Sequence, residues 1–134
     1  MTPLPTLALE QFQLRRRVAQ AKVTAREWTA EEADARLYPW LAMALVCGAD
    51  AAQLHPQLLD TLADYQRVGN SPASARALAA MAYCPTEDMR AEIAKARDHA
   101  FRTNNPHRAA LSEIADAIHC PAFTGEAEPE QEAA

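Results

Sequence analysis

Residues 29–48 have the sequence TAEEADARLYPWLAMALVCG, and this stretch decides the fold. Thr29 and Glu32 form a capping box, in which each side chain accepts a hydrogen bond from the other residue's backbone N–H at the start of a helix. The eight residues before Gly48 are apolar on every side of a helix, which predicts a buried central helix. Gly48 is placed to end it, since glycine readily adopts the left-handed conformation that closes helices. Pro39 predicts a kink or a break within it.

The composition of the whole chain favours the same fold class. The 134 residues include 31 Ala and only seven Val or Ile. Alanine costs least to hold in a helix, whereas β-branched residues favour strands. Three Gly leave few positions for hairpin turns or phosphate-binding loops. We therefore predict an all-α fold, a compact bundle of about six helices, and exclude β-sandwiches, β-barrels and Gly-rich nucleotide sites.

Apolar residues at three- and four-residue spacing predict the remaining helices, at residues 6–26, 56–68, 73–83, 87–102 and 106–120. Pro56, Pro72 and Pro106 stand where proline often begins a helix. Thr86 is expected to cap the helix at 87–102. We expect a single helical domain over residues 1–125. Residues 126–134 contain four Glu and no basic residue, which predicts a disordered acidic tail.

A spacing in the chain suggests an alternative arrangement of these helices. Helices are expected to end at Cys47, Cys84 and Cys120, which are 37 and 36 residues apart. A period of this size is typical of helical hairpins that stack side by side. The middle unit, with LHPQLLDTL at 54–62 and ARALAAMA at 75–82, resembles a HEAT-type repeat. That resemblance implies stacked helical hairpins as the alternative to a simple bundle.

Charge is distributed unevenly along the chain. The net charge is −5, but without the four Glu of the tail there are 14 acidic and 13 basic residues. Residues 11–26 contain five basic residues and no acidic one. These five, Arg15, Arg16, Arg17, Lys22 and Arg26, are the predicted binding residues. They would attract phosphates, an acidic protein surface or the chain's own acidic tail.

The residue types that bind metals or catalyse reactions are present without the patterns these functions need. Zinc sites are usually built from close pairs of ligands, and none occurs among the three Cys and four His. Asp116 and His119 have half the spacing of a di-iron motif, and no second motif accompanies them. The cysteines are expected to pack as small apolar residues at helix ends. We therefore predict no enzyme activity, no metal, no cofactor and no small-molecule substrate.

Cysteine usage and hydropathy indicate the compartment. An odd number of Cys favours free thiols in a reducing environment. No apolar run reaches the roughly 18 to 20 residues that a membrane span needs. Residues 1–9 carry no positive charge before an apolar stretch, unlike a secretory signal. We expect a cytoplasmic protein without a membrane partner.

Residues 61–78, TLADYQRVGNSPASARAL, resemble the helix-turn-helix of bacterial repressors, with Gly69 in the turn and a second helix that begins after Ser71. The resemblance implies that Ser74 and Arg76 would contact DNA bases. A capping turn between two structural helices accounts for the same residues.

A third resemblance concerns residues 26–33, REWTAEEA, and 36–41, RLYPWL, which are similar to segments of small uncharacterised proteins of phages and integrated elements in GC-rich bacteria. It implies a protein that acts on another macromolecule. An Ala-rich helical body with a basic helix and an acidic tail is typical of adaptors, inhibitors and assembly factors. We predict a non-enzymatic protein that binds a protein partner or itself, with Trp28 and Trp40 as core or interface anchors. A small helix-turn-helix DNA-binding protein is the alternative.

Overall fold

A computed structural model describes residues 2–120, so the predicted acidic tail lies outside the described residues. Within this range the chain forms six α-helices, one short 3-10 helix and no strand, which confirms the predicted all-α class. The elements are α1 (Leu4–Thr24), α2 (Ala30–Val46), η1 (Ala51–Gln53), α3 (Leu58–Arg67), α4 (Pro72–Tyr83), α5 (Thr86–Arg102) and α6 (Arg108–His119). None of these helices is both long and apolar enough to cross a membrane.

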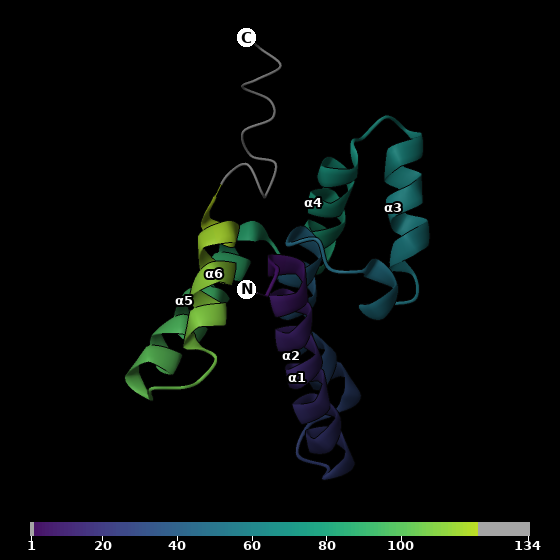
Figure 1. Ribbon diagram of the computed structural model, residues 1–134. Coiled ribbons are helices and arrows are strands. Elements are labelled where there is room, and N and C mark those ends of the chain that lie inside the picture. The colour runs from purple at the N-terminus through teal and green to yellow at the C-terminus, as the bar shows by residue number, and fades with distance from the viewer. Residues whose placement is uncertain (1, 121–134) are drawn as a thin grey trace.

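The six helices form three helical hairpins, α1/α2, α3/α4 and α5/α6. Helix α2 is central, because it packs against α1, α4, α5 and α6. The α3/α4 hairpin lies on one side of α1/α2 and the α5/α6 hairpin on the other (Figure 1). A repeat stacked in sequence order would have its second hairpin in the middle, whereas here the first hairpin is in the middle. The chain therefore forms hairpins that surround α2, and they are not stacked in sequence order.

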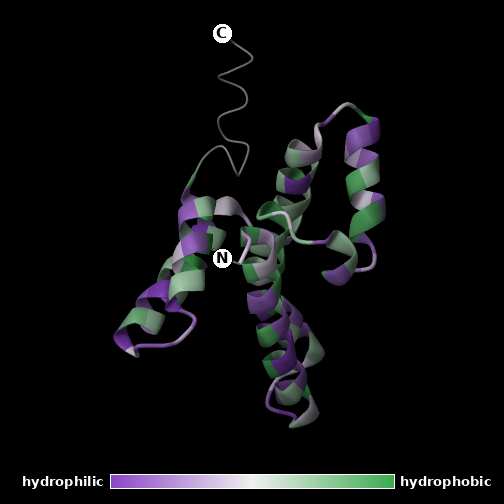
Figure 2. Cartoon of the chain, viewed as in Figure 1, coloured by the Kyte–Doolittle hydropathy of each residue, from purple (hydrophilic) through white to green (hydrophobic). Residues whose placement is uncertain are grey.

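The local signals that predicted α2 are present in the structure. The Thr29 hydroxyl accepts a hydrogen bond from the Glu32 N–H at 3.1 Å, and the Glu32 carboxylate accepts one from the Thr29 N–H at 3.4 Å. All eight residues from 40 to 47 are buried. Gly48 has φ +97° and ends the helix as predicted. Helix α3 at the edge instead alternates hydrophobic and hydrophilic residues (Figure 2), since only one of its faces is covered.

Of the kink or break expected at Pro39, the break is absent, because α2 continues through Pro39 as one helix. Pro39 has no N–H to donate to the carbonyl of Ala35, and proline in a helix interior costs about 3 kcal/mol. The side chains that follow it are buried, among them Trp40, Met43 and Leu45. Burying each such large apolar side chain contributes roughly 1.5–3 kcal/mol. Packing of the second half of α2 therefore outweighs the local cost of the proline.

The cap predicted at Thr86 is wrong. Thr86 lies inside α5, and Pro85 is the residue that caps the helix. Pro85 has the extended conformation of an N-cap, with φ −58° and ψ 148°, and its carbonyl accepts the N–H of Met89 at 3.0 Å. The fixed φ of proline thus sets the helix start without a side-chain cap.

Two other helices start slightly later than predicted. Helices α3 and α6 each begin two residues after the expected proline, Pro56 or Pro106. In both cases the residue before the proline organises a turn: the His55 ring accepts the N–H of Gln57 at 3.2 Å, and the Asn105 side chain accepts the N–H of His107 at 2.8 Å. Each proline therefore lies in a turn that leads into the helix.

The core is built around α2 from one face of each neighbouring helix. Its largest fully buried side chains are Phe12, Met43, Leu45, Leu58, Met89, Ile93, Ile114 and Ile118. Helix α4 contributes buried alanines instead, including Ala75, Ala79 and Ala80. Because alanine side chains are short, α4 packs closely on α2 with little apolar area per contact.

Candidate binding pocket

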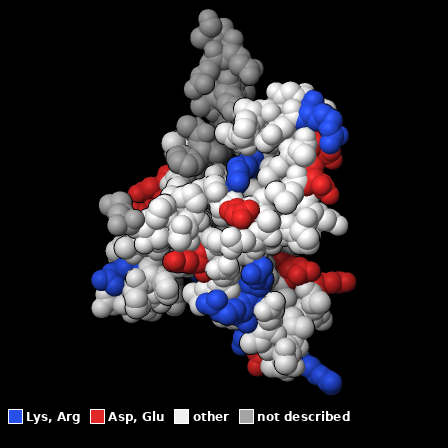
Figure 3. Space-filling view, turned by 45° about the vertical axis from the view of Figure 1, so that its right-hand side comes forward, with Lys and Arg blue, Asp and Glu red and all other residues white. Residues whose placement is uncertain are grey.

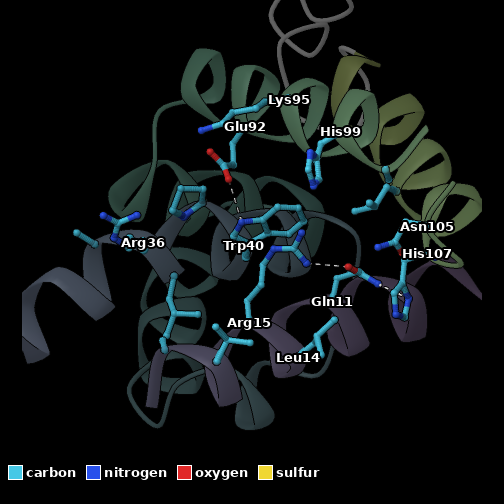
Figure 4. Close-up of a pocket in the computed structure, with 18 of the residues that line it drawn as sticks. Gln11, Leu14, Arg15, Arg36, Trp40, Glu92, Lys95, His99, Asn105 and His107 are labelled. Atoms are coloured by element: carbon cyan, nitrogen blue, oxygen red, sulfur yellow. Dashed lines mark hydrogen bonds between the residues drawn. The ribbon is translucent and has the colours of Figure 1, made fainter. Parts of the chain in front are cut away.

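A pocket of about 620 Å³ opens between α1, α2, α5 and the start of α6. Its apolar lining comes from Leu14, Val18, Ala19, Trp28, Ala35, Leu37, Pro39, Trp40, Ala96, Ala100 and Leu111. Its polar lining comes from Gln11, Arg15, Arg36, Glu92, Lys95, His99, Asn105 and His107. Trp40 lies at its centre (Figure 4), so we name it the Trp40 pocket. Of the described residues, three Arg or Lys side chains and one acidic side chain line the pocket, which makes this wall positively charged.

Trp40 is fixed by contacts with two other helices. Its side chain is 3% exposed, and its indole Nε1–H donates to the Glu92 carboxylate of α5 at 3.3 Å. A buried indole N–H needs such an acceptor. The bond therefore holds Trp40 and Glu92 in a defined arrangement across the α2–α5 contact.

Arg15 of α1 packs on the face of the Trp40 indole ring. Its guanidinium carbon lies 3.4 Å from the centre of the Trp40 ring, a cation–π contact. Its Nη1 donates to the Gln11 side-chain oxygen at 2.7 Å. Arg15 forms no ion pair with any acidic residue that the structure describes. Burial lowers the pKa of Arg15 from 12.5 to about 10, an effect that the charge of Glu92 opposes, and Arg15 stays protonated at neutral pH.

Gln11 connects Arg15 to a third side chain. Gln11 is 2% exposed and lies one helical turn before Arg15 on α1. Its amide nitrogen donates to Nδ1 of His107 at 3.2 Å. Since an amide nitrogen only donates, this Nδ1 is the unprotonated nitrogen of the ring. A continuous polar chain thus runs from His107 through Gln11 to Arg15, which packs on the Trp40 ring (Figure 4).

Trp28 and Arg36 form another part of the wall. Trp28 is half-buried and lies between α1 and α2, and the guanidinium carbon of Arg36 lies 4.5 Å from its ring centre. Trp40 is therefore a buried core residue that also lines the pocket, whereas Trp28 is only partly covered. The two predicted anchors share one pocket.

The five predicted binding residues have different local surroundings in the structure. Arg15 is the only one of them that lines the Trp40 pocket. Arg16 points elsewhere, since its Nη1 donates to the backbone carbonyl of Gln53 at 3.4 Å, and Arg17 is exposed. Consecutive residues of a helix lie about 100° apart, so a run of three arginines cannot face one site.

The last two of these residues have local roles. Lys22 pairs with Glu27 at 2.7 Å. Arg26 follows the end of α1 with φ +61°, a left-handed conformation, and Glu27 N–H then donates to the Lys22 carbonyl at 2.9 Å to close the helix. Basic side chains do gather on the face seen in Figure 3, with acidic side chains beside them.

The sequence prediction missed the partners of Arg15. Gln11, Arg15 and Val18 follow a spacing of four and three residues on α1, and Glu92, Lys95 and His99 repeat such spacing on α5. Each set lies along one face of its helix. This spacing was a usable signal for the two faces, but the packing of α1 against α2 and α5 is what brings them together.

The segment that resembles a helix-turn-helix forms α3, a turn with Gly69 at φ +108°, and α4. Ser71 caps α4 by accepting the Ser74 N–H at 3.1 Å. Nη1 of Arg76 donates to the carbonyls of Leu45 and Ala49, each at 2.9 Å. One of the two expected DNA contacts is therefore directed to the end of α2.

The buried thiols are poorly suited to act as nucleophiles. Burial raises the pKa of Cys47 from 9.0 to about 12. Burial and the nearby charges of Asp88 and Glu92 raise the pKa of Cys84 to about 11. Both remain protonated at neutral pH, and the thiolate is the reactive form. Over residues 2–120, no group of three His, Cys, Asp or Glu side chains is placed to hold a metal ion.

Comparison with known proteins gives no assignment, since no family model, curated protein or solved structure matches the chain. The class that the fold and the pocket define is a small helical protein with a positively charged, tryptophan-lined pocket.

Proposed function

We propose that the protein is a non-enzymatic binding protein, and that its Trp40 pocket holds a short segment of a partner protein. The observation that carries this proposal is the composition of the pocket wall. Trp28, Trp40 and Arg15 line one hollow of about 620 Å³. Tryptophan and arginine are the residue types that most often dominate binding energy at protein interfaces, especially in well-packed pockets.

The charge of the wall favours an acidic partner segment. Arg15, Arg36 and Lys95 are cationic, and Glu92 is the one acidic residue of the lining within residues 2–120. Complementary charge speeds association and rejects partners of the wrong sign.

Site-specific photo-cross-linking in the source cell tests this proposal. A photoreactive amino acid is placed at Ala35, which is exposed and lines the pocket, or at Ala63, which is exposed on α3 outside it. A pocket-bound partner is captured from Ala35 and not from Ala63. Equal capture at the two positions would reject the pocket as the binding site.

The captured protein is then purified and titrated onto the purified chain, with tryptophan fluorescence as the signal. Lys95→Glu reverses a charge of the pocket wall and is expected to weaken binding about tenfold. Arg102→Glu is the matched control, because Arg102 lies on the same helix, exposed and outside the pocket. Equal affinities of the two variants contradict the proposal.

Duplex DNA is titrated in parallel at low and moderate salt. Binding that falls steeply with salt and is lost when Arg15, Arg16 and Arg17 become Ala would favour the DNA-binding alternative instead.

A further inference from the structure

We infer that the Trp40 pocket recognises a carboxylate, the Asp or Glu side chain of an acidic partner segment, and that Arg15 is the residue that binds it. This inference rests on the proposed function and deepens it by naming the chemical group that is recognised. It depends on how Arg15 is held and on how many of its N–H donors have no acceptor among residues 2–120.

The Arg15 guanidinium is held in one orientation and has N–H donors that contact no acceptor among residues 2–120. A guanidinium carries five N–H donors in a rigid fork. One face of the fork lies on the Trp40 ring, and Nη1 donates to Gln11 at 2.7 Å. Among residues 2–120 no other acceptor and no counter-ion contacts the group. A carboxylate that accepts two parallel N–H bonds matches this fork, and such charge-assisted pairs are among the strongest hydrogen bonds in proteins.

The surroundings of Arg15 favour a peptide carboxylate over inorganic phosphate. The Glu92 carboxylate accepts the indole N–H at the edge of the ring that Arg15 covers, so it repels any anionic ligand. The second charge of a phosphate raises this repulsion and the attraction to Arg15, Arg36 and Lys95 alike, so charge alone does not select between the two anions. The apolar side chains of the pocket lining, such as Leu14 and Leu37, suit an acidic residue that is followed by an apolar one, whereas inorganic phosphate has no apolar group.

Gln11 and His107 are positioning residues for Arg15. Gln11 is buried, and it is held by His107 on one side while it holds Arg15 on the other. Replacing the Gln11 amide by a carboxylate would place an internal anion at the position that now contacts Nη1 at 2.7 Å. That anion would compete with the carboxylate of a ligand.

The test uses the whole chain and two blocked dipeptides that differ in one group. N-acetyl-Glu-Phe-amide carries one carboxylate and one aromatic ring, and N-acetyl-Gln-Phe-amide replaces the carboxylate with an amide. Proton–nitrogen NMR follows the Trp40 indole N–H and the Arg15 Nε–H during titration. We expect saturable shifts with the Glu peptide and about tenfold weaker binding of the Gln peptide. Equal affinities, or no shift with either peptide, overturn the inference.

Inorganic phosphate at the same concentrations is the second arm. It is expected to shift the two signals less than the Glu peptide does. Shifts as large as those of the peptide would show a general anion site and overturn the preference for a carboxylate.

Three variants test whether Arg15 and Gln11 determine the binding of the Glu peptide. Arg15→Lys keeps the charge but loses the fork, and we expect about tenfold weaker binding of the Glu peptide. Arg17→Lys, an exposed change on the same helix, leaves it unchanged. Gln11→Glu also weakens binding about tenfold by supplying the competing carboxylate. Circular dichroism checks that each variant is folded, and unchanged affinity of folded Gln11→Glu protein contradicts the assigned geometry.

The two proposals fail in different ways. If both dipeptides bind equally while Ala35 still captures a partner, partner binding stands and the carboxylate inference falls. If the Glu peptide binds in an Arg15-dependent manner but no protein is captured from Ala35, the carboxylate site stands and the proposed function falls.

Discussion

Arg76→Met tests whether Arg76 is a structural residue of α4. In the structure its Nη1 bridges the carbonyls of Leu45 and Ala49, at the end of α2 where the helix dipole is negative. If the segment were instead a DNA-reading helix, Arg76 would be free to reach bases, and its loss would leave stability unchanged. Methionine keeps most of the apolar stem, so the substitution removes mainly the two hydrogen bonds and the charge.

The structure sets the size of the expected loss. A hydrogen bond from a charged group contributes about 1.5–3 kcal/mol. The Leu45 carbonyl keeps a second donor, the Gly48 N–H at 3.2 Å, so its bond to Arg76 counts for less. We therefore expect Arg76→Met to lower the free energy of unfolding by about 3 kcal/mol. For 134 residues the unfolding entropy is about 0.28 kcal/mol/K, so Tm falls by about 10 °C.

Urea and thermal unfolding followed by circular dichroism measure this loss. Arg67→Met is the matched control, since Arg67 is exposed on α3 and, in the part of the chain that the structure describes, pairs only with Asp64, at 2.8 Å. Its loss should change stability by no more than about 0.5 kcal/mol. Equal stabilities of the two variants, together with weakened DNA binding by Arg76→Met, would refute the structural role of Arg76.

Three further predictions follow from the caps and the thiols. Arg26→Gly should raise the unfolding free energy by about 0.5–1 kcal/mol in urea titrations, because glycine adopts the left-handed φ of +61° without a steric penalty; a lower value contradicts this. Thr29→Ala should lower it by about 1 kcal/mol by removing the capping box, and no change would show that the box contributes nothing. Cys47 and Cys84 have raised pKa values in the fold, so above pH 9.0 unfolded thiols lose protons that the native protein keeps, and stability should fall as pH rises; constant stability to pH 11 would reject those shifts.

The parts of the fold that were predictable are those determined by neighbours in sequence. The Thr29–Glu32 capping box, the apolar residues 40–47 and Gly48 specify α2 without any tertiary contact. Local propensity also gave six helices. It could not decide between a kink and a break at Pro39, where α2 continues because the residues that follow are buried against other helices.

The candidate site was less predictable for the same reason. The sequence singled out Arg15 only as one of five basic residues, and it gave no sign that Arg15 would lie on Trp40, 25 residues away. The partner of Trp40, Glu92, comes from a third helix. Periodicity identifies one face of each helix, but which faces meet depends on the packing of all three hairpins around α2.

The buried charge of Arg15 links the proposed carboxylate binding to the stability of the fold. Lowering the pKa of Arg15 from 12.5 to about 10 means that the fold holds its charge at a cost of about 3 kcal/mol, reduced where solvent reaches the group. An apolar residue at this position of α1 would avoid that cost. A carboxylate bound to Arg15 would offset it, because an opposite charge nearby favours the protonated guanidinium. The proposed ligand binding would therefore be linked to folding through Arg15, and at one ligand concentration a carboxylate ligand should raise Tm in the wild-type protein more than in Arg15→Lys.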